Sequence, residues 1–252
     1  MISREKDSHK GENGKVAVIG GSVDYTGAPA LSAQAALRTG ADLVKILTSE
    51  KVKEVVSGYS ENLIVEGYEG KYFGEPSMQK AERLDDWADV LVVGPGIGCA
   101  RQDLLKEFLE RSNTPKVIDA EAIQTAIRSN VSGAVFTPHT GEAELIEKKY
   151  DNMESFIEMK NDVTVLLKGP DDRIYSGEGL EEVSAGHPGM TVGGTGDVLT
   201  GIVAELIAQG MSKKEAAVKS AEINGKAGEK AAERYGEGLV ATDLLEEIPN
   251  FT

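Results

Sequence analysis

Apolar residues occur along this chain in two alternating patterns. Short continuous apolar runs that end in glycine, proline or a charged residue are typical of strands buried on both faces. Stretches with small or apolar residues at every third or fourth position are typical of helices. The runs predict strands at 15–19, 42–47, 62–65, 89–93, 116–118, 134–136, 163–167 and 173–175. The periodic stretches predict helices at 28–38, 51–57, 79–87, 104–109, 143–149, 198–207, 212–234 and 241–247.

Strands that alternate with helices through most of a chain indicate an α/β fold, with a mostly parallel central sheet covered by helices on both faces. The run at 173–175 is expected to return beside 163–167 as a hairpin. Residues 68–78 contain glycines and a proline, and we expect them to form a loop. We expect residues 1–252 to form a single domain, because no repeat or low-complexity linker divides them.

Four of the predicted strands end in glycine turns or in charged groups. Right-handed crossovers place the carboxyl ends of parallel strands at one edge of the sheet, where open α/β sheets bind ligands. The four ends are therefore expected to surround one cleft, although a glycine turn can also be only a tight turn. They are Gly20-Gly21-Ser22, residues 94–98 (Gly-Pro-Gly-Ile-Gly), Thr137-Pro138-His139 and Lys168-Gly169.

The segment 191–201 joins a glycine-rich turn to the start of an apolar helix. Gly193, Gly194 and Gly196 would leave backbone N–H groups free at the helix N-terminus, which is a ready site for an anion such as phosphate. Asp197 follows in the first turn, where a carboxylate repels phosphate unless it takes a proton from the attacking group. The segment thus predicts an anion hole with a general base at Asp197, opposite Lys168. The alternative is that Asp197 only complements the helix dipole.

Charge and cysteine content narrow the class of partner. The chain has 252 residues, a net charge of −15 and an isoelectric point near 4.7, which argues against binding a nucleic-acid polymer or an anionic membrane surface. Cys99 is the single cysteine, so neither an intrachain disulfide nor a thiolate metal cluster is expected, and a cytoplasmic location is favoured.

Two further kinds of segment are not expected. Residues 1–7 are charged and do not resemble a signal peptide, and no apolar run approaches the roughly 18 residues of a membrane-spanning helix. His139 has no second histidine at a zinc-ligand spacing, so zinc is not expected. The residues that would ligate any other metal stay unassigned.

Taken together, these segments resemble the ADP/ATP-dependent NAD(P)H-hydrate dehydratase family of the ribokinase-like superfamily. The resemblance covers nearly the whole chain, in the family's order, and it implies a three-layer αβα sandwich. The Gly-Thr-Gly-Asp at 194–197 indicates only the superfamily, whereas the ensemble is specific to the family. The matching segments are 9–14, 20–22, 25–28, 36–41, 94–98, 137–142, 168–169, 189–199 and 239–245.

The resemblance implies repair of the S-epimer of hydrated NADH and NADPH. ADP or ATP would phosphorylate the ring hydroxyl, Mg²⁺ would bridge the phosphate oxygens, and departure of phosphate would restore the dinucleotide. The resemblance implies that the hydrated dinucleotide contacts Ala28, Gly96, Gly98, His139 and Asp197. It implies that the adenine nucleotide contacts Lys168, Gly169, Pro170, Asp171, Asp172, Thr195 and Gly196.

Three features depart from the family's pattern. The family usually has Asp-Ala-Asp where this chain has Asp119-Ala120-Glu121, which leaves the role of the second acid open. Asn224 stands where a histidine is often found. The epimerase domain that is fused to some members has no room in 252 residues, so a separate epimerase is expected in the same pathway.

Two rival functions use the same residues. A ribokinase-like kinase that phosphorylates a sugar or vitamin hydroxyl would share Asp197 and the anion hole, because a fold does not fix a function. A nucleotide sensor without catalytic activity would bind the phosphates and leave Asp197 without a chemical role. The resemblance also implies a homo-oligomer. It does not choose between ADP and ATP, or between the hydrates of NADH and NADPH.

Overall fold

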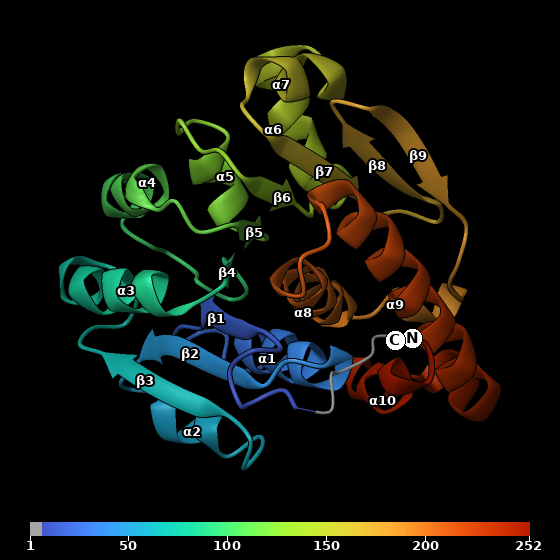
Figure 1. The fold of residues 1–252 in the computed structure, drawn as a ribbon, viewed down its shortest axis with the longest axis horizontal. Coiled ribbons are helices and arrows are strands. Elements are labelled where there is room, and N and C mark those ends of the chain that lie inside the picture. Colours follow the sequence, from blue (N-terminus) through green and yellow to red (C-terminus); the bar gives the residue numbers. More distant parts are fainter. Residues whose placement is uncertain (1–6) are drawn as a thin grey trace.

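A nine-stranded sheet runs through the middle of the molecule (Figure 1), in a computed structural model that describes residues 7–252. The strand order is β3-β2-β1-β4-β5-β6-β7-β8-β9. Strands β1 to β7 are parallel, whereas β8 is antiparallel to both of its neighbours. The strands are β1 (Lys15–Ile19), β2 (Leu43–Ser49), β3 (Ile64–Tyr68), β4 (Val90–Val93), β5 (Lys116–Ile118), β6 (Ala134–Phe136), β7 (Val163–Leu167), β8 (Asp172–Ser176) and β9 (Gly179–Val183).

Helices cover both faces of the sheet, which confirms the predicted α/β fold with three layers. Helices α3 to α7 bury one face in a first core, and α1, α2, α8, α9 and α10 cover the other face (Figure 1). The helices are α1 (Gly27–Thr39), α2 (Lys53–Ser57), α3 (Glu75–Trp87), α4 (Gln102–Arg111), α5 (Ala122–Ala126), α6 (Thr140–Tyr150), α7 (Met153–Met159), α8 (Thr195–Ala208), α9 (Lys213–Tyr235) and α10 (Ala241–Glu247). Short 3₁₀ turns lie at Pro188–Met190, Gly236–Gly238 and Ile248–Asn250.

The start of α3 differs from the prediction. The helix begins at Glu75 rather than near residue 79, so the predicted loop at 68–78 is wrong in its second half. Pro76 does not break the helix, because a proline in the first turn lacks only an N–H that would have no intrahelical partner. Ser77 closes this turn by accepting a hydrogen bond from the backbone N–H of Gly74 at 3.0 Å.

Three short elements were not predicted. Helices α5 and α7 are too short for a helical period to emerge from the sequence. Strand β9 lies at the edge of the sheet, and only Val183 is buried there, so the strand lacks an apolar run. The strand predicted at 62–65 is Ile64–Tyr68 in the structure.

Close packing of α1 against α8 fixes the first turn of α8. An added Cβ at Gly201 would lie only 2.0 Å from the carbonyl oxygen of Ser32, so the two helices meet backbone to backbone. The Ser32 hydroxyl donates to the carbonyl oxygen of Asp197 at 2.9 Å, and the Thr200 hydroxyl donates to the same oxygen at 2.7 Å. The position of Asp197 is thereby set from a helix near the start of the chain.

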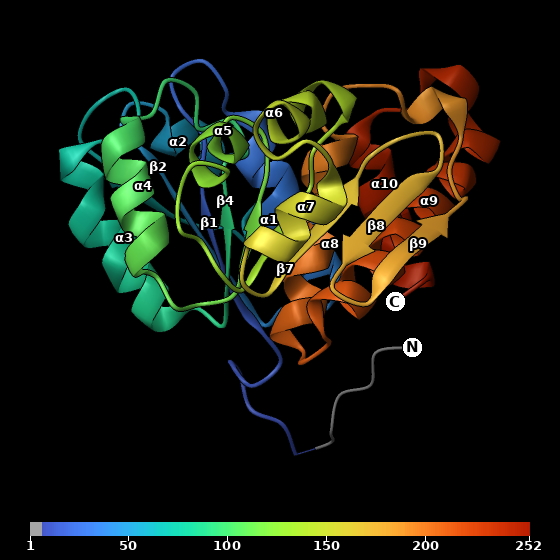
Figure 2. The same ribbon diagram turned by 90° about the horizontal axis from the view of Figure 1, so that it is seen from above.

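The carboxyl ends of β1 to β7 lie at one edge of the sheet. Figure 2 shows the N-terminal segment entering β1 from the opposite edge. Among residues 7–252, no helix is both long and apolar enough to cross a membrane. The prediction that the N-terminus is not a signal peptide falls almost entirely on residues 1–6, which lie outside the described residues.

Candidate functional site

The strand order reverses between β1 and β4, and the loops that follow these two strands form one wall of a cleft. The N–H of Gly21 donates to the carbonyl oxygen of Pro95 at 2.8 Å, which ties the two loops together. Gly96 has a φ of +64°, and an added Cβ would lie 2.8 Å from Tyr25 Cβ and 3.2 Å from Ala28 Cβ. The structure therefore brings Ala28 and Gly96 together, as their shared assignment requires.

A pocket of about 310 Å³ opens beside these loops. Tyr25, Gly98 and Cys99 line it from the β1 and β4 side, and Glu121 and Gln124 line it from the segment after β5. Gly98 is therefore one of the residues that line this pocket. Glu121, the acid that departs from the family's pattern, lines the same pocket from the segment after β5.

The ends of β5, β6 and β7 carry a buried group of polar side chains. The ammonium of Lys168 donates to Asp119 Oδ1 at 2.8 Å, and the hydroxyl of Thr137 donates to the same oxygen at 2.8 Å. The backbone N–H of Lys168 donates to the carbonyl oxygen of Pro138 at 2.8 Å, which joins the loop after β7 to the loop after β6. The anionic partner of Lys168 is therefore Asp119.

The N-terminus of α8 faces this group. Gly194 is the N-cap of the helix and has a φ of +100°, and the Thr195 hydroxyl donates to the carbonyl oxygen of Met190 at 3.1 Å. An added Cβ at Gly196 would lie 3.1 Å from the ammonium nitrogen of Lys168, whereas one at Gly193 would meet no atom within 4 Å. The free N–H groups of a helix start and a lysine ammonium thus meet at the edge of open space, which is an arrangement suited to phosphate.

Asp197 lies in the first turn of α8 and has an altered acidity. Burial raises the pKa of its carboxyl to about 7, and the nearby carboxylate of Asp119 adds to the rise. Lys168 acts in the opposite direction, and Glu121 and Glu142 contribute smaller increases. A carboxylate with a pKa near the working pH is well matched to the role of general base.

Lys168 stays protonated in spite of its burial. Desolvation alone lowers the pKa of the Lys168 ammonium, but attraction to Asp119, with smaller contributions from Glu142 and Asp197, outweighs it and raises the pKa. The side chain of Lys168 is 20% exposed and that of Asp119 is 4% exposed, so the pair faces the cleft from the lysine side. A positive charge is therefore held against Asp119 and acts on the carboxylate of Asp197.

His139 begins α6. Its Nδ1 accepts hydrogen bonds from the N–H groups of Gly141 at 3.0 Å and Glu142 at 3.3 Å, and Glu142 accepts from the N–H of His139 at 2.9 Å. The structure places His139 beside Lys168 in an isolated bridge between the β6 and β7 loops. Its side chain is 62% exposed, which leaves the imidazole ring open to a ligand as well as capping the helix.

The loop from Lys168 to Asp172 is mostly open to solvent. Gly169, Pro170 and Asp171 are exposed, and the side chain of Asp172 accepts from the N–H of Gly169 at 3.0 Å. Burial raises the pKa of Asp172, and its bond from the Gly169 N–H opposes the rise. Five of the predicted nucleotide-binding residues thus form the short stretch Lys168–Asp172, and the other two, Thr195 and Gly196, lie in the first turn of α8.

The comparisons with known proteins agree with this geometry. A family model described as NAD(P)H-hydrate dehydratase matches residues 16–250. The ADP-dependent (S)-NAD(P)H-hydrate dehydratase of Natrialba magadii is 44% identical over 98% of this chain and 95% of its own length. The chain belongs to the NAD(P)H-hydrate dehydratase family.

Similarity also extends to a longer bifunctional relative and to solved structures with the same fold. The bifunctional NAD(P)H-hydrate repair enzyme of Methanothermobacter thermautotrophicus is 40% identical over 98% of this chain, which spans 51% of that protein. A ribokinase-like superfamily protein of Enterococcus faecalis has a TM-score of 0.85 at 26% identity, covering 99% of this chain and 90% of that one. The ADP/ATP-dependent dehydratase of Bacillus subtilis, co-crystallised with ATP and Mg²⁺, has a TM-score of 0.82 at 22% identity, covers 100% and 93%, and supports the fold alone.

Three residues near the site have no role assigned from the sequence. Asp119 follows β5, and the signal that could single it out is a second charged residue, Lys168, at the end of a nearby strand. Glu142 lies within the expected cluster after β6, and burial raises the pKa of its carboxyl. Asn224 is buried on α9, and its side-chain oxygen has no hydrogen-bond partner among the described residues.

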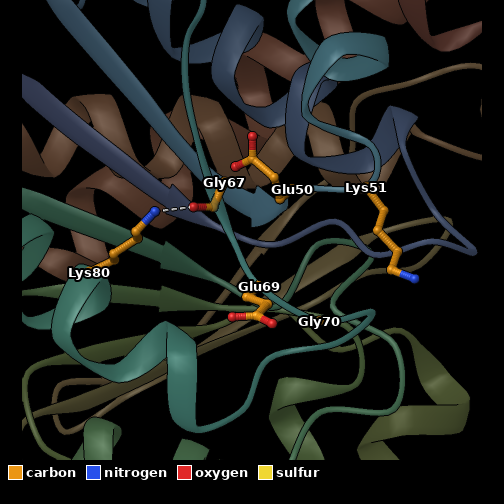
Figure 3. Close-up of a pocket in the computed structure, with 6 residues that line it drawn as sticks. All are labelled: Glu50, Lys51, Gly67, Glu69, Gly70 and Lys80. Atoms are coloured by element: carbon orange, nitrogen blue, oxygen red, sulfur yellow. Dashed lines mark hydrogen bonds between the residues drawn. The ribbon is translucent and has the colours of Figure 1, made fainter.

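A second pocket of about 390 Å³ lies near the carboxyl ends of β2 and β3, beside the outermost strand β3 (Figure 3). It is lined by Glu50, Lys51, Gly67, Glu69, Gly70 and Lys80. The ammonium of Lys80 donates to the carbonyl oxygen of Gly67, and lysines and glutamates balance in number. None of the predicted site residues lines this pocket.

Proposed function

We propose that this chain dehydrates the S-epimers of hydrated NADH and NADPH, with ADP as phosphoryl donor. Membership of the family and the name of the Natrialba magadii relative support the reaction and the donor. The observation that carries the proposal is the partly buried Asp197 in the first turn of α8, whose carboxyl lies close enough to Lys168 and to Glu121, which lines the pocket at Gly98, for both charges to act on it. This arrangement serves phosphorylation of a hydroxyl group.

The reaction has two steps. Asp197 takes the proton of the ring hydroxyl as the hydroxyl oxygen attacks the terminal phosphoryl group of ADP, and the bond from that phosphorus to the bridging oxygen breaks to release AMP. The N–H groups at residues 193–196 and the ammonium of Lys168 stabilise the charge on the transferring group. The C–O bond of the phosphorylated ring then breaks, since phosphate leaves far more readily than hydroxide, and loss of a ring proton restores the double bond.

The two ligands occupy opposite sides of Asp197. The nucleotide lies over the loop Lys168–Asp172 and the start of α8, where Thr195 and Gly196 contact its phosphates. The hydrated ring lies on the side of Ala28, Gly96 and the pocket at Gly98, with His139 on the far wall. The hydroxyl of the ring and the terminal phosphate therefore meet at Asp197.

Magnesium is proposed as a companion of the nucleotide. Among residues 7–252, no group of three or more histidine, cysteine or acidic side chains could hold a metal ion. Mg²⁺ ordinarily binds through substrate phosphates, waters and one or two carboxylates, so the protein is not expected to hold the ion by itself. When bound, the ion supplies charge neutralisation on the phosphates.

The cellular setting follows from the same assignment. We propose a cytoplasmic enzyme that acts together with a separate epimerase, because only one epimer of the hydrate is a substrate. Association into a homo-oligomer, and the absence of nucleic-acid polymers and membranes among its partners, are part of this proposal. The net charge of −15 supports the second point.

The test is a nucleotide-dependence assay on hydrated NADH. Purified protein, hydrated NADH and ADP are expected to give the absorbance of reduced nicotinamide and an equal amount of free phosphate, with ATP compared in parallel. A stable phosphorylated product without reduced NADH would instead identify a small-molecule kinase. Nucleotide binding without either product would identify a sensor.

The rate is expected to rise with pH through about 7, because Asp197 acts as a base only when its carboxyl is ionised and its pKa is raised to about 7. The measurement is kcat/KM for hydrated NADH between pH 5 and 9, with circular dichroism at each pH to show that the fold is intact. A single acidic limb with its midpoint near 7 is the expected result. A midpoint near the ordinary value of an aspartate, about 4, would contradict it.

A further inference from the structure

Asp119 joins the ends of three adjacent strands. It follows β5, and its Oδ1 accepts from the ammonium of Lys168 after β7 and from the hydroxyl of Thr137 after β6, each at 2.8 Å. Its side chain is 4% exposed, so water does not compete for these bonds. Neither step of the proposed reaction gives the Asp119 carboxylate a contact with the hydrated ring or with the nucleotide.

The backbone that carries Asp119 cannot shift easily. The N–H of Asp119 donates to the carbonyl oxygen of Val93 at 3.1 Å, at the end of the neighbouring β4. An added Cβ at Gly94 would lie 1.9 Å from the carbonyl oxygen of Asp119, which shows how closely the two backbones pack. The carboxylate is therefore a fixed point, and the flexible member of the pair is the four-carbon stem of Lys168.

Three carboxylates lie near the ammonium of Lys168. The carboxylates of Asp119, Glu142 and Asp197 all attract its ammonium. A direct pair with Asp197 would hold that carboxylate ionised at lower pH and would make it a weaker base, because an opposite charge favours the charged form. A direct Lys168–Asp197 pair would also neutralise the lysine charge that would otherwise stabilise a bound phosphate.

We propose that Asp119 is a positioning residue: it holds the Lys168 ammonium beside the start of α8 and away from a direct pair with the Asp197 carboxylate. Lys168 thereby stays available to the phosphates, and Asp197 stays available to the substrate hydroxyl. This role rests on the proposed function of the same site. It assigns to the buried ion pair a purpose other than stability, to which such pairs contribute little by themselves.

The variant Asp119→Asn tests the proposal, since it keeps the shape and the acceptor oxygen but removes the charge. Charged groups that face Asp197 come from the loop after β5 (Asp119 and Glu121), from α6 (Glu142) and from the end of β7 (Lys168). Loss of the Asp119 charge and release of Lys168 both stabilise ionised Asp197, so the pKa of Asp197 is expected to fall. The midpoint of the acidic limb of kcat/KM is therefore expected to lie at a lower pH than in the wild type. At pH 8, kcat/KM is expected to fall about 10- to 100-fold, because Asp197 is a weaker base and Lys168 no longer contacts the phosphates correctly.

A matched control lies elsewhere in the chain. Lys213 pairs with Asp162 at the same N–O distance of 2.8 Å, at the edge of the sheet where β7 begins. Asp162→Asn makes the same chemical change in an ion pair that does not face the cleft, and it is expected to leave the pH profile in place. A shift of the same size in both variants would overturn the proposal.

The double variant with Lys168→Met separates a positioning role from a direct one. If Asp119 acts through Lys168, then Asp119→Asn is expected to cost little further activity in the Lys168→Met background. Full multiplication of the two losses would show that Asp119 acts independently and would overturn the proposal.

A readout that needs no turnover distinguishes failure of this inference from failure of the proposed function. The carboxyl of Asp197 can be titrated by ¹³C NMR in wild type and in Asp119→Asn, and the affinity for ADP can be measured by calorimetry in both. A lower Asp197 midpoint and weaker ADP binding support the positioning role even if hydrated NADH is not the substrate. Unchanged values for both overturn it even if the dehydratase activity is real.

Discussion

Asp197→Asn is expected to lower kcat for hydrated NADH by about 10²- to 10⁴-fold, which is the usual contribution of a positioned general base. Asparagine fills the same space but cannot take the proton of the ring hydroxyl. Binding of ADP, measured by calorimetry, is expected to persist, because the N–H groups of α8 and Lys168 are unchanged. The acidic limb of the pH profile is expected to disappear in the residual activity.

The control is Asp103→Asn. Asp103 also lies in the first turn of a helix, α4, but pairs with Arg101 at the surface. It is expected to retain wild-type kinetics. Equal and small effects of the two substitutions would mean that Asp197 serves only the helix dipole, and the catalytic assignment would fail.

Asp197→Asn is also expected to be more stable to unfolding than the wild type above pH 7. Because the pKa of Asp197 is about 7 in the folded chain and near 3.8 in the unfolded one, the folded state binds the extra proton between these values. Stability is therefore lost as pH rises from about 4 to 7, by an amount on the order of a few kcal/mol. Urea titrations of both proteins at pH 5 and 8 check this: the gap in the free energy of unfolding should be larger at pH 8.

Gly194→Ala is expected to lower kcat/KM by about 10²- to 10³-fold, comparable with loss of one donor from an oxyanion hole. Gly194 has a φ of +100°, and an added Cβ would lie 2.6 Å from Leu31 Cδ1 and 2.8 Å from Ala241 Cβ. Relief of this overlap must move the first turn of α8 away from α1 and α10. The N–H groups then no longer point at the phosphoryl group.

The control for this substitution is Gly177→Ala between β8 and β9, where an added Cβ meets no atom within 4 Å. It is expected to leave kcat/KM unchanged. Thermal melts show whether Gly194→Ala is folded, and kinetics are compared only where it is. Near-normal kcat/KM in a folded Gly194→Ala protein would place phosphoryl transfer elsewhere.

Most of the sheet could be predicted from the sequence because its strands are buried on both faces. Such strands, for example the fully buried β4, are continuous apolar runs that stand out from their surroundings. Strand β9 was not predicted, because an edge strand with one buried residue has no continuous apolar run. Helix α3 was predicted to begin too late, since Pro76 reads as a break when the first turn of the helix is not yet known.

Some features of the candidate site could also be predicted from the sequence, and others depend on the fold. The glycines around Thr195 and the acid at Asp197 are adjacent in sequence, so their joint chemistry could be predicted from local rules. The partner of Lys168 could not, because Asp119 lies 49 positions away and its pairing depends on the order of β5, β6 and β7. The raised pKa of Asp197 likewise depends on burial and on three carboxylates from two other segments, the loop after β5 and helix α6.

The hydrogen bond from the Ser32 hydroxyl to the Asp197 carbonyl spans 165 positions of the chain. Loop-closure entropy makes contacts of such long range late and costly to form during folding. The first turn of α8 is therefore locked only when the earliest helix has docked onto the last third of the chain. A partly folded chain offers no partial active site, and recovery of activity after dilution from denaturant reports completion of the whole fold.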